Sequence, residues 1–201
     1  MRARILFLCL FFLPHALPAA TLLVLGDSLS AAWGIEAEQG WVARLQERLN
    51  ARHPGWTVVN AAVSGDTTRT ALNRLPPLLQ RHRPAVVIVQ LGGNDGLRGI
   101  PLEEMADNLA AIIRHARKGG ARVLLVGVRL PPNYGPWYTR RFAQVYHRLA
   151  EEYGVPLVPR LLESVADDVR NMQDDGIHPR AEAQARMLDN VWPVLEPLLK
   201  Q

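Results

Sequence analysis

Four short blocks of the chain contain the groups that acyl transfer requires. Together they offer a hydroxyl nucleophile, an oriented base and hydrogen-bond donors for a developing oxyanion. One such block would be weak support, but four of them in order fill every role of the site. In chain order they are Gly26-Asp27-Ser28-Leu29-Ser30, Val63-Ser64-Gly65-Asp66, Gly92-Gly93-Asn94-Asp95 and Asp175-Gly176-Ile177-His178-Pro179.

Ser28 is the candidate nucleophile. It follows the apolar run Thr21–Leu25, which predicts a buried strand with a turn from Gly26 onward. Ligands bind at the carboxyl edge of an open parallel sheet, so a reactive side chain is well placed there. Taken alone, Ser28 has an alternative interpretation as an N-cap or turn serine, because such residues are favoured where a strand leads into a helix.

The candidate base is His178, because a serine hydroxyl is a weak nucleophile until an adjacent base removes its proton. Asp175 precedes His178 by three residues. In a tight turn this spacing lets the carboxylate accept from one imidazole nitrogen while the other faces Ser28. Asp174 is the second choice for the orienting role, and a plain turn before the last helix is the alternative interpretation. The other histidines lie in the N-terminal apolar segment or on Arg-rich helical patterns: His15, His53, His82, His115 and His147.

Gly65 and Asn94 are the candidate oxyanion donors. Gly65 follows the predicted strand Trp56–Val63 and Asn94 follows Ala85–Leu91, so we expect both at the same sheet edge as Ser28. A glycine lets the backbone approach a ligand without a Cβ in the way, and an asparagine offers a side-chain N–H. For an isolated copy of residues 92–96, turn chemistry alone is the alternative interpretation.

These blocks resemble those of the GDSL or SGNH hydrolase family. The runs TLLVLGDSLSAAWG (21–34) and RLPPNYG (129–135) are similar to its bacterial periplasmic branch of arylesterases, thioesterases and lysophospholipases. The resemblance implies a triad of Ser28, Asp175 and His178, with oxyanion donors from the Ser28 N–H, Gly65 and Asn94. Trp33 stands where this branch more often has tyrosine, which bears on the shape of the acyl pocket. No serine lies in a Gly-x-Ser-x-Gly motif, which argues against the nucleophile elbow of α/β-hydrolases.

The remaining pattern is an alternation of strands and helices, which predicts an α/β fold. We expect a three-layer α/β/α sandwich with a mostly parallel, five-stranded, flavodoxin-like sheet. A break near Pro76-Pro77 is expected in the second helix, and turns or kinks at Pro193 and Pro197 in the last. The predicted strands are Thr21–Leu25, Trp56–Val63, Ala85–Leu91, Arg122–Val128 and Val155–Val158. The predicted helices are Gly40–Asn50, Thr67–Gln80, Leu102–Lys118, Pro136–Tyr153 and Ala181–Leu199.

Two loops at the expected active edge mix apolar or aromatic residues with Gly and Pro. They cover residues 96–100 and 131–138, and they suit an acyl-chain groove with a mobile lid. Ordinary loop packing is the alternative interpretation. The expected substrate-binding residues are Trp33, Leu97, Ile100, Tyr134 and Trp137.

The N-terminus predicts export from the cytoplasm. Met1–Ala20 has a charged start, a short apolar centre and a small-residue end, which is typical of a signal peptide cleaved near Ala20. Residues 21–201 would then form one domain without cysteine, since Cys9 is the only cysteine of the chain. We expect a periplasmic or secreted monomer.

Charge and motif content restrict the partners. Removal of Arg2 and Arg4 with the signal peptide lowers the net charge from +4 to +2, so a nucleic-acid partner is not indicated. Contact with a membrane surface would be transient at most. No cluster has metal-ligand spacing, so we expect neither a metal nor another cofactor.

The favoured function is hydrolysis of acyl esters, including aryl esters, acyl-thioesters and lysophospholipids, through an acyl-enzyme at Ser28. Two alternatives remain open at this stage. A carbohydrate O-acetylesterase would use the same groups in a more open, polar site. A non-catalytic binding module of the cell envelope would share only the fold.

Overall fold

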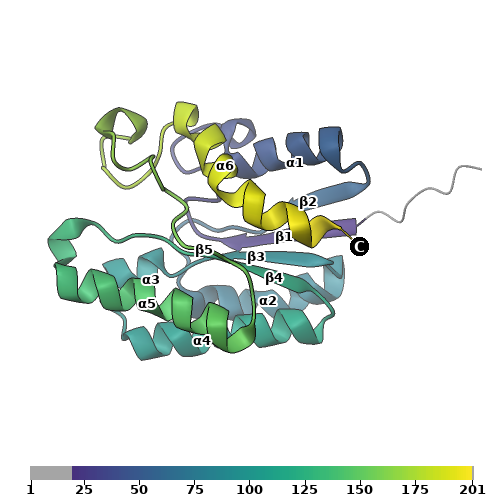
Figure 1. The fold of residues 1–201 in the computed structure, drawn as a ribbon, viewed down its shortest axis with the longest axis horizontal. Helices are drawn as coiled ribbons and strands as arrows, with labels where there is room; N and C mark the ends of the chain where they lie inside the picture. Colours follow the sequence, from purple (N-terminus) through teal and green to yellow (C-terminus); the bar gives the residue numbers. More distant parts are fainter. Residues whose placement is uncertain (1–19, 201) are drawn as a thin grey trace, which may run out of the picture.

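The fold is a three-layer α/β/α sandwich around a five-stranded sheet (Figure 1). The computed structural model describes residues 20–200, so the predicted signal peptide falls outside the described residues except for Ala20. All strands are parallel, in the order β2-β1-β3-β4-β5. The strands are β1 (Ala20–Gly26), β2 (Trp56–Asn60), β3 (Val86–Gln90), β4 (Arg122–Val126) and β5 (Leu157–Val158).

Helices cover both faces of the sheet, which explains why the central strands read as continuous apolar runs. On one face α1 (Trp41–Arg52) packs beside α6 (Gln184–Leu195). On the other face α4 (Leu102–Lys118) lies between α2 (Thr68–His82) and α5 (Pro136–Tyr153). The predicted architecture is therefore confirmed. None of the helices in the described part of the chain is long and apolar enough to cross a membrane.

The strands end earlier than the sequence predicts. β2 stops at Asn60 rather than Val63, and β4 stops at Val126 rather than Val128. Beyond these ends the chain still bonds to the neighbouring strands: the Val63 N–H donates to the Gly26 carbonyl at 3.0 Å, and the Gly127 N–H donates to the Val158 carbonyl at 2.8 Å. Val63 is partly exposed, whereas Val128 is buried. Contact with the sheet therefore extends past the last residue of each regular strand.

The helix α2 continues through Pro76 and Pro77, so the predicted break is wrong. Both prolines lie on the exposed side of the helix, where water can satisfy the carbonyl groups that lose their N–H partners. Ala71 and Leu75 on the inner face are fully buried. Their burial against the sheet holds the helix together across the two missing hydrogen bonds.

The last helical segment is divided rather than continuous. α6 is preceded by a 3-10 turn at Ala181–Ala183 and followed by another at Glu196–Leu199. Pro193 lies inside α6, whereas Pro197 falls in the second 3-10 turn. Only Pro197 therefore coincides with a change of helix type.

A short helix, α3 (Gly93–Leu97), stands where the sequence predicts a loop. It begins after Gly92, whose φ of 109° is a backbone conformation that favours glycine. A Cβ at Gly92 would lie 2.3 Å from the hydroxyl oxygen of Tyr146. The same hydroxyl donates a hydrogen bond of 2.7 Å to the Leu91 carbonyl, so Tyr146 fixes the chain between β3 and α3.

The Tyr146→Phe variant should therefore be less stable than the wild type. It leaves the buried Leu91 carbonyl without its donor, which lowers the free energy of unfolding by about 1–3 kcal/mol. Urea denaturation measures this loss. The matched control is Tyr153→Phe, whose hydroxyl accepts from Arg114 near the surface and should matter by less than about 0.5 kcal/mol. Equal losses in the two variants would contradict this role of Tyr146.

Candidate active site

The turn after β1 presents Ser28 at the carboxyl edge of the sheet. The backbone N–H groups of Ser30 and Ala31 donate to the Asp27 carbonyl at 3.1 and 3.0 Å. The Leu29 N–H donates to the Asp27 carboxylate at 3.0 Å. This local hydrogen bonding is typical of an Asx turn, and it leaves the Ser28 side chain directed out of the sheet edge.

His178 lies between Ser28 and Asp175. Its Nε2 is 2.8 Å from the Ser28 Oγ, and its Nδ1 is 2.6 Å from one oxygen of Asp175. The other oxygen of Asp175 accepts from the backbone N–H groups of Ile177 and His178 at 2.9 and 3.0 Å. The three side chains therefore form one continuous chain of hydrogen bonds, brought together from the two ends of the domain.

Asp175 is held in its ionised form. Burial by itself raises the pKa of this carboxyl, but hydrogen bonds from the His178 ring and from the two backbone N–H groups outweigh it. Together they lower the pKa of Asp175 to about 2. Asp174 lies elsewhere: its side chain is 99% exposed and pairs with Arg180 at 2.8 Å.

The loop that carries Asp175 and His178 is anchored by Gln173, which the sequence analysis did not single out. The Gln173 N–H donates to the His178 carbonyl at 2.7 Å, which closes the loop on itself. Its side-chain amide donates to the Trp33 carbonyl at 2.8 Å, which ties the loop to the segment after Ser28. Gly176 has a φ of 66°, as the tight turn between Asp175 and His178 requires.

Gly65 and Asn94 lie on the same cavity as Ser28 and His178. The Asn94 side-chain amide donates one hydrogen bond to the Asp66 carbonyl at 2.9 Å, which leaves its second N–H available. Gly65 has a φ of 84° in a turn closed by the Asp66 N–H and the Val63 carbonyl at 3.1 Å. Within residues 20–200, neither the Ser28 N–H nor the Gly65 N–H donates to another protein group.

Asp27 is a second carboxyl at the site, in a different environment. It is 2% exposed, and one oxygen accepts from the Leu29 N–H and from the Gln90 side chain at 3.0 Å each. Burial raises the pKa of Asp27 to about 6, although these hydrogen bonds and the nearby His178 act in the opposite direction. Gln90 also accepts from the Ser30 hydroxyl at 2.6 Å, so a buried polar network supports the serine turn.

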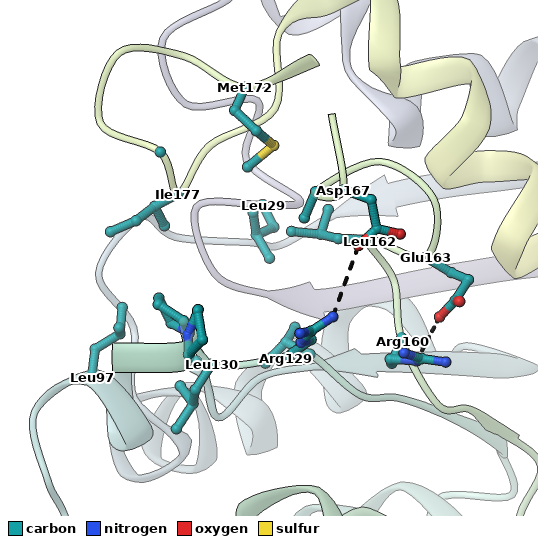
Figure 2. A pocket seen from close by; sticks show the side chains of 16 residues that line it. Leu29, Leu97, Arg129, Leu130, Arg160, Leu162, Glu163, Asp167, Met172 and Ile177 are labelled. Atoms are coloured by element: carbon teal, nitrogen blue, oxygen red, sulfur yellow. Dashed lines mark ion pairs between the residues drawn. The ribbon is translucent and has the colours of Figure 1, made fainter. Parts of the chain in front are cut away.

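A second cavity of about 260 Å³ adjoins the one that contains Ser28 (Figure 2). The two share Leu29, Gly93, Leu97 and Ile177. The part near Leu97, Leu130 and Ile177 is apolar, whereas the ion pairs Arg129–Asp167 and Arg160–Glu163 border the other end. Further apolar lining comes from residues that the sequence did not predict to bind substrate: Val128, Leu130, Leu162, Ala166 and Met172.

The expected substrate-binding residues separate into two groups. Trp33 and Leu97 line the Ser28 cavity, and the Trp33 ring centroid is 6.1 Å from that of His178. Ile100, Tyr134 and Trp137 line neither of the two cavities. The Tyr134 hydroxyl instead donates to the Leu97 carbonyl at 3.0 Å, behind the cavity wall. Trp137 is 63% exposed, with the Arg141 guanidinium 4.8 Å from its ring centroid.

Only weak sequence patterns indicated the residues of the second cavity that were not predicted. Val128 and Leu130 continue the apolar run of β4, and Leu162 and Ala166 are spaced by four residues in a segment without regular structure. Within residues 20–200, no three His, Cys, Asp or Glu side chains are grouped so that they could hold a metal ion.

This fold and site belong to a known class of hydrolases. Residues 24–186 match the model of the GDSL-like Lipase/Acylhydrolase family, and the chain belongs to that family.

Three relatives illustrate the similarity. Esterase TesA of Pseudomonas aeruginosa is 51% identical over 201 residues, which cover 99% of this chain and 100% of the relative. Thioesterase 1/protease 1/lysophospholipase L1 of Escherichia coli K12 is 43% identical over 92% of this chain and 88% of that protein. The crystal structure of the psychrotrophic esterase EstA from Pseudoalteromonas sp., inhibited by monoethylphosphonate, has a TM-score of 0.85. It is 36% identical over 90% of this chain and 99% of that one.

The two neighbouring carboxylates of the loop should differ sharply in their effect on catalysis. Asp175→Ala removes the group that orients the His178 ring, so we expect kcat to fall by about 10³–10⁴-fold. Asp174→Ala removes only a surface ion pair and should change kcat by less than about twofold. Steady-state hydrolysis of a p-nitrophenyl ester measures both. A larger loss of kcat in the Asp174 variant would show that Asp174, and not Asp175, orients His178.

Proposed function

We propose that this protein hydrolyses acyl esters and thioesters through an acyl-enzyme at Ser28, with His178 as general base and Asp175 as its orienting partner. The observation that carries the proposal is the hydrogen-bond chain from the Ser28 Oγ through both His178 ring nitrogens to the Asp175 carboxylate. A serine becomes nucleophilic when a base of this kind accepts its proton.

The proposed reaction has two steps. In the first, the Ser28 Oγ attacks the acyl carbonyl carbon, and its proton passes to the His178 Nε2 and then to the leaving alcohol or thiol. In the second, His178 takes a proton from water as the water oxygen attacks the acyl carbonyl carbon. The bond between this carbon and the Ser28 Oγ then breaks, His178 returns the proton to the Oγ, and the carboxylic acid is released. The N–H groups of Ser28, Gly65 and the Asn94 side chain would hold the negative oxygen in both tetrahedral intermediates. Asp175 stays ionised and stabilises the imidazolium.

The proposed substrates carry an apolar acyl group. The cavity beside Ser28 is lined mainly by aliphatic side chains, which favours a hydrocarbon chain over a sugar. The named activities of the relatives, esterase, thioesterase and lysophospholipase, support the same class. Inhibition of the Pseudoalteromonas esterase by monoethylphosphonate supports a nucleophile that forms a covalent adduct. Aryl esters, acyl-thioesters and lysophospholipids fall within this class.

We also propose a monomer in the periplasm or outside the cell, with at most transient contact with membranes. Ala20 begins β1 at the end of the sheet opposite Ser28, so cleavage near this residue leaves the site intact. The N-terminal sequence of the protein from a periplasmic extract tests the cleavage. A single peak at the monomer mass in sizing experiments tests the assembly state, and a dimer mass would contradict it.

The Ser28→Ala variant should fold normally and lose ester hydrolysis by several powers of ten, on the order of 10⁶ in kcat. A fluorophosphonate should label the wild type on the peptide that contains Ser28 and leave the variant unlabelled. Ser30→Ala is less suitable as a control because Ser30 supports the turn through Gln90, so Ser164→Ala serves instead. Near wild-type hydrolysis by the Ser28 variant would end the proposal.

Chain length tests the role of the second cavity. Leu162 lines this cavity but not the one that contains Ser28, whereas the nearby Val169 is exposed. Leu162→Ala should lower kcat/KM for octanoyl esters by about tenfold and spare acetyl esters, because apolar contacts with the chain are lost. Val169→Ala should keep the wild-type chain-length profile. Equal losses on acetyl and octanoyl esters would favour the carbohydrate deacetylase alternative.

A further inference from the structure

The helix α3 reaches the turn at residues 63–66 with two side chains. Asn94 and Arg98 are four residues apart and therefore lie on one face, with Arg98 as the residue that ends the helix. The Asn94 amide donates to the Asp66 carbonyl at 2.9 Å, and the Arg98 guanidinium donates to the Gly65 carbonyl at 3.0 Å. Two consecutive carbonyls of the turn are thus held by one face of α3.

We propose that Arg98 is a positioning residue that fixes the Gly65 turn against α3, so that the Gly65 N–H and the Asn94 amide converge on one oxyanion. This inference rests on the proposed function, because it assigns Arg98 a task in the same site. Arg98 itself lies at the rim of the site, and its contact is with the backbone of Gly65.

A positioning residue is needed because the two oxyanion donors come from different segments of the chain. Gly65 lies in the loop after β2, and Asn94 lies in the helix after β3. Oxyanion donors stabilise a transition state only when their positions are held to about 0.5 Å, and a displacement of 1 Å can lower the rate by about 10²-fold. The position of the loop after β2 relative to α3 therefore determines whether both donors can reach one oxyanion.

The backbone of Gly65 makes few other hydrogen bonds, although the start of its turn is anchored to β1 through the Val63 N–H, which donates to the Gly26 carbonyl at 3.0 Å. The turn is closed by one backbone hydrogen bond from the Asp66 N–H to the Val63 carbonyl. The next residue, Asp66, is tied to α2 through its carboxylate, which accepts from Arg74 and from the Thr70 hydroxyl. Among the hydrogen bonds of residues 20–200, Arg98 supplies the only one from a side chain to the Gly65 backbone.

Arg98 is poorly suited to a purely structural role. Its side chain is exposed, and no carboxylate in the described part of the chain lies within ion-pair distance of it. Exposed side chains of this kind contribute little to folding free energy. Truncation should therefore disturb the turn locally and leave the sheet and its core intact.

The test compares Arg98→Ala and Arg98→Lys with the matched control Arg141→Ala, another exposed arginine, which stacks on Trp137 and pairs with Glu103. With p-nitrophenyl octanoate, Arg98→Ala should lower kcat by about 10–100-fold while KM changes by less than about twofold. Arg98→Lys should lose less, because an ammonium can still donate to the Gly65 carbonyl. Arg141→Ala should match the wild type.

A transition-state readout separates positioning from a general structural effect. An alkylboronic acid forms a tetrahedral adduct with an active-site serine, so its Ki depends on the oxyanion donors. We expect Ki for Arg98→Ala to rise by the same factor as kcat/KM falls, and free guanidinium below denaturing concentrations to restore part of kcat. Unchanged kcat, an unchanged boronic acid Ki or a loss confined to KM would each overturn the role of Arg98.

The same series distinguishes failure of this inference from failure of the proposed function. If Ser28→Ala is inactive and Arg98→Ala matches the wild type, only the role of Arg98 is wrong. If Ser28→Ala retains activity, the proposed function is wrong, and the inference about Arg98 fails with it. Urea denaturation of each Arg98 variant shows whether the fold is preserved, and the Lys variant keeps the test valid if the Ala variant unfolds.

Discussion

The contact between His178 and Ser28 is the constraint on which the rest of the site depends. It joins residues 150 positions apart in the sequence, at 2.8 Å between Nε2 and Oγ. The loop around His178 serves this contact: Gln173 closes it and ties it to the Trp33 carbonyl, and Gly176 permits its turn. The loop packs at the edge of the parallel sheet where Ser28 lies, because the carboxyl ends of all parallel strands meet at the same edge.

Two carboxyl groups near His178 have different pKa values because their environments differ. Asp175 accepts several hydrogen bonds, and these keep its pKa at about 2, so it remains an anion that can stabilise a protonated His178. Asp27 is buried below the serine turn, where desolvation raises its pKa to about 6. Their environments, rather than their residue type, suit Asp175 to orienting His178 and Asp27 to supporting the turn.

Features set by local sequence, and the long-range site implied by the family resemblance, could be predicted, whereas details of side-chain packing could not. The helices Leu102–Lys118 and Pro136–Tyr153 have the predicted bounds because periodicity and terminal Gly or Pro define them locally. The three-residue spacing of Asp175 and His178, with Gly176 between them to allow a tight turn, likewise indicates that the two side chains can reach each other. The second cavity gave no comparable signal, since its walls come from segments far apart in the chain, such as Leu130 and Leu162. The helix through Pro76 and Pro77 survives by burial of its inner face, which residue preferences do not reveal.

The central claim is that Ser28 carries the acyl group between two half-reactions. Rapid-quench hydrolysis of p-nitrophenyl octanoate, followed by peptide mass spectrometry, tests it most directly. The account predicts a burst of p-nitrophenol equal to the enzyme concentration where deacylation is slow, with an octanoyl group on the peptide that contains Ser28. An octanoyl group on another residue, or turnover with water attacking the ester directly and no acylated peptide at any quench time, would contradict it.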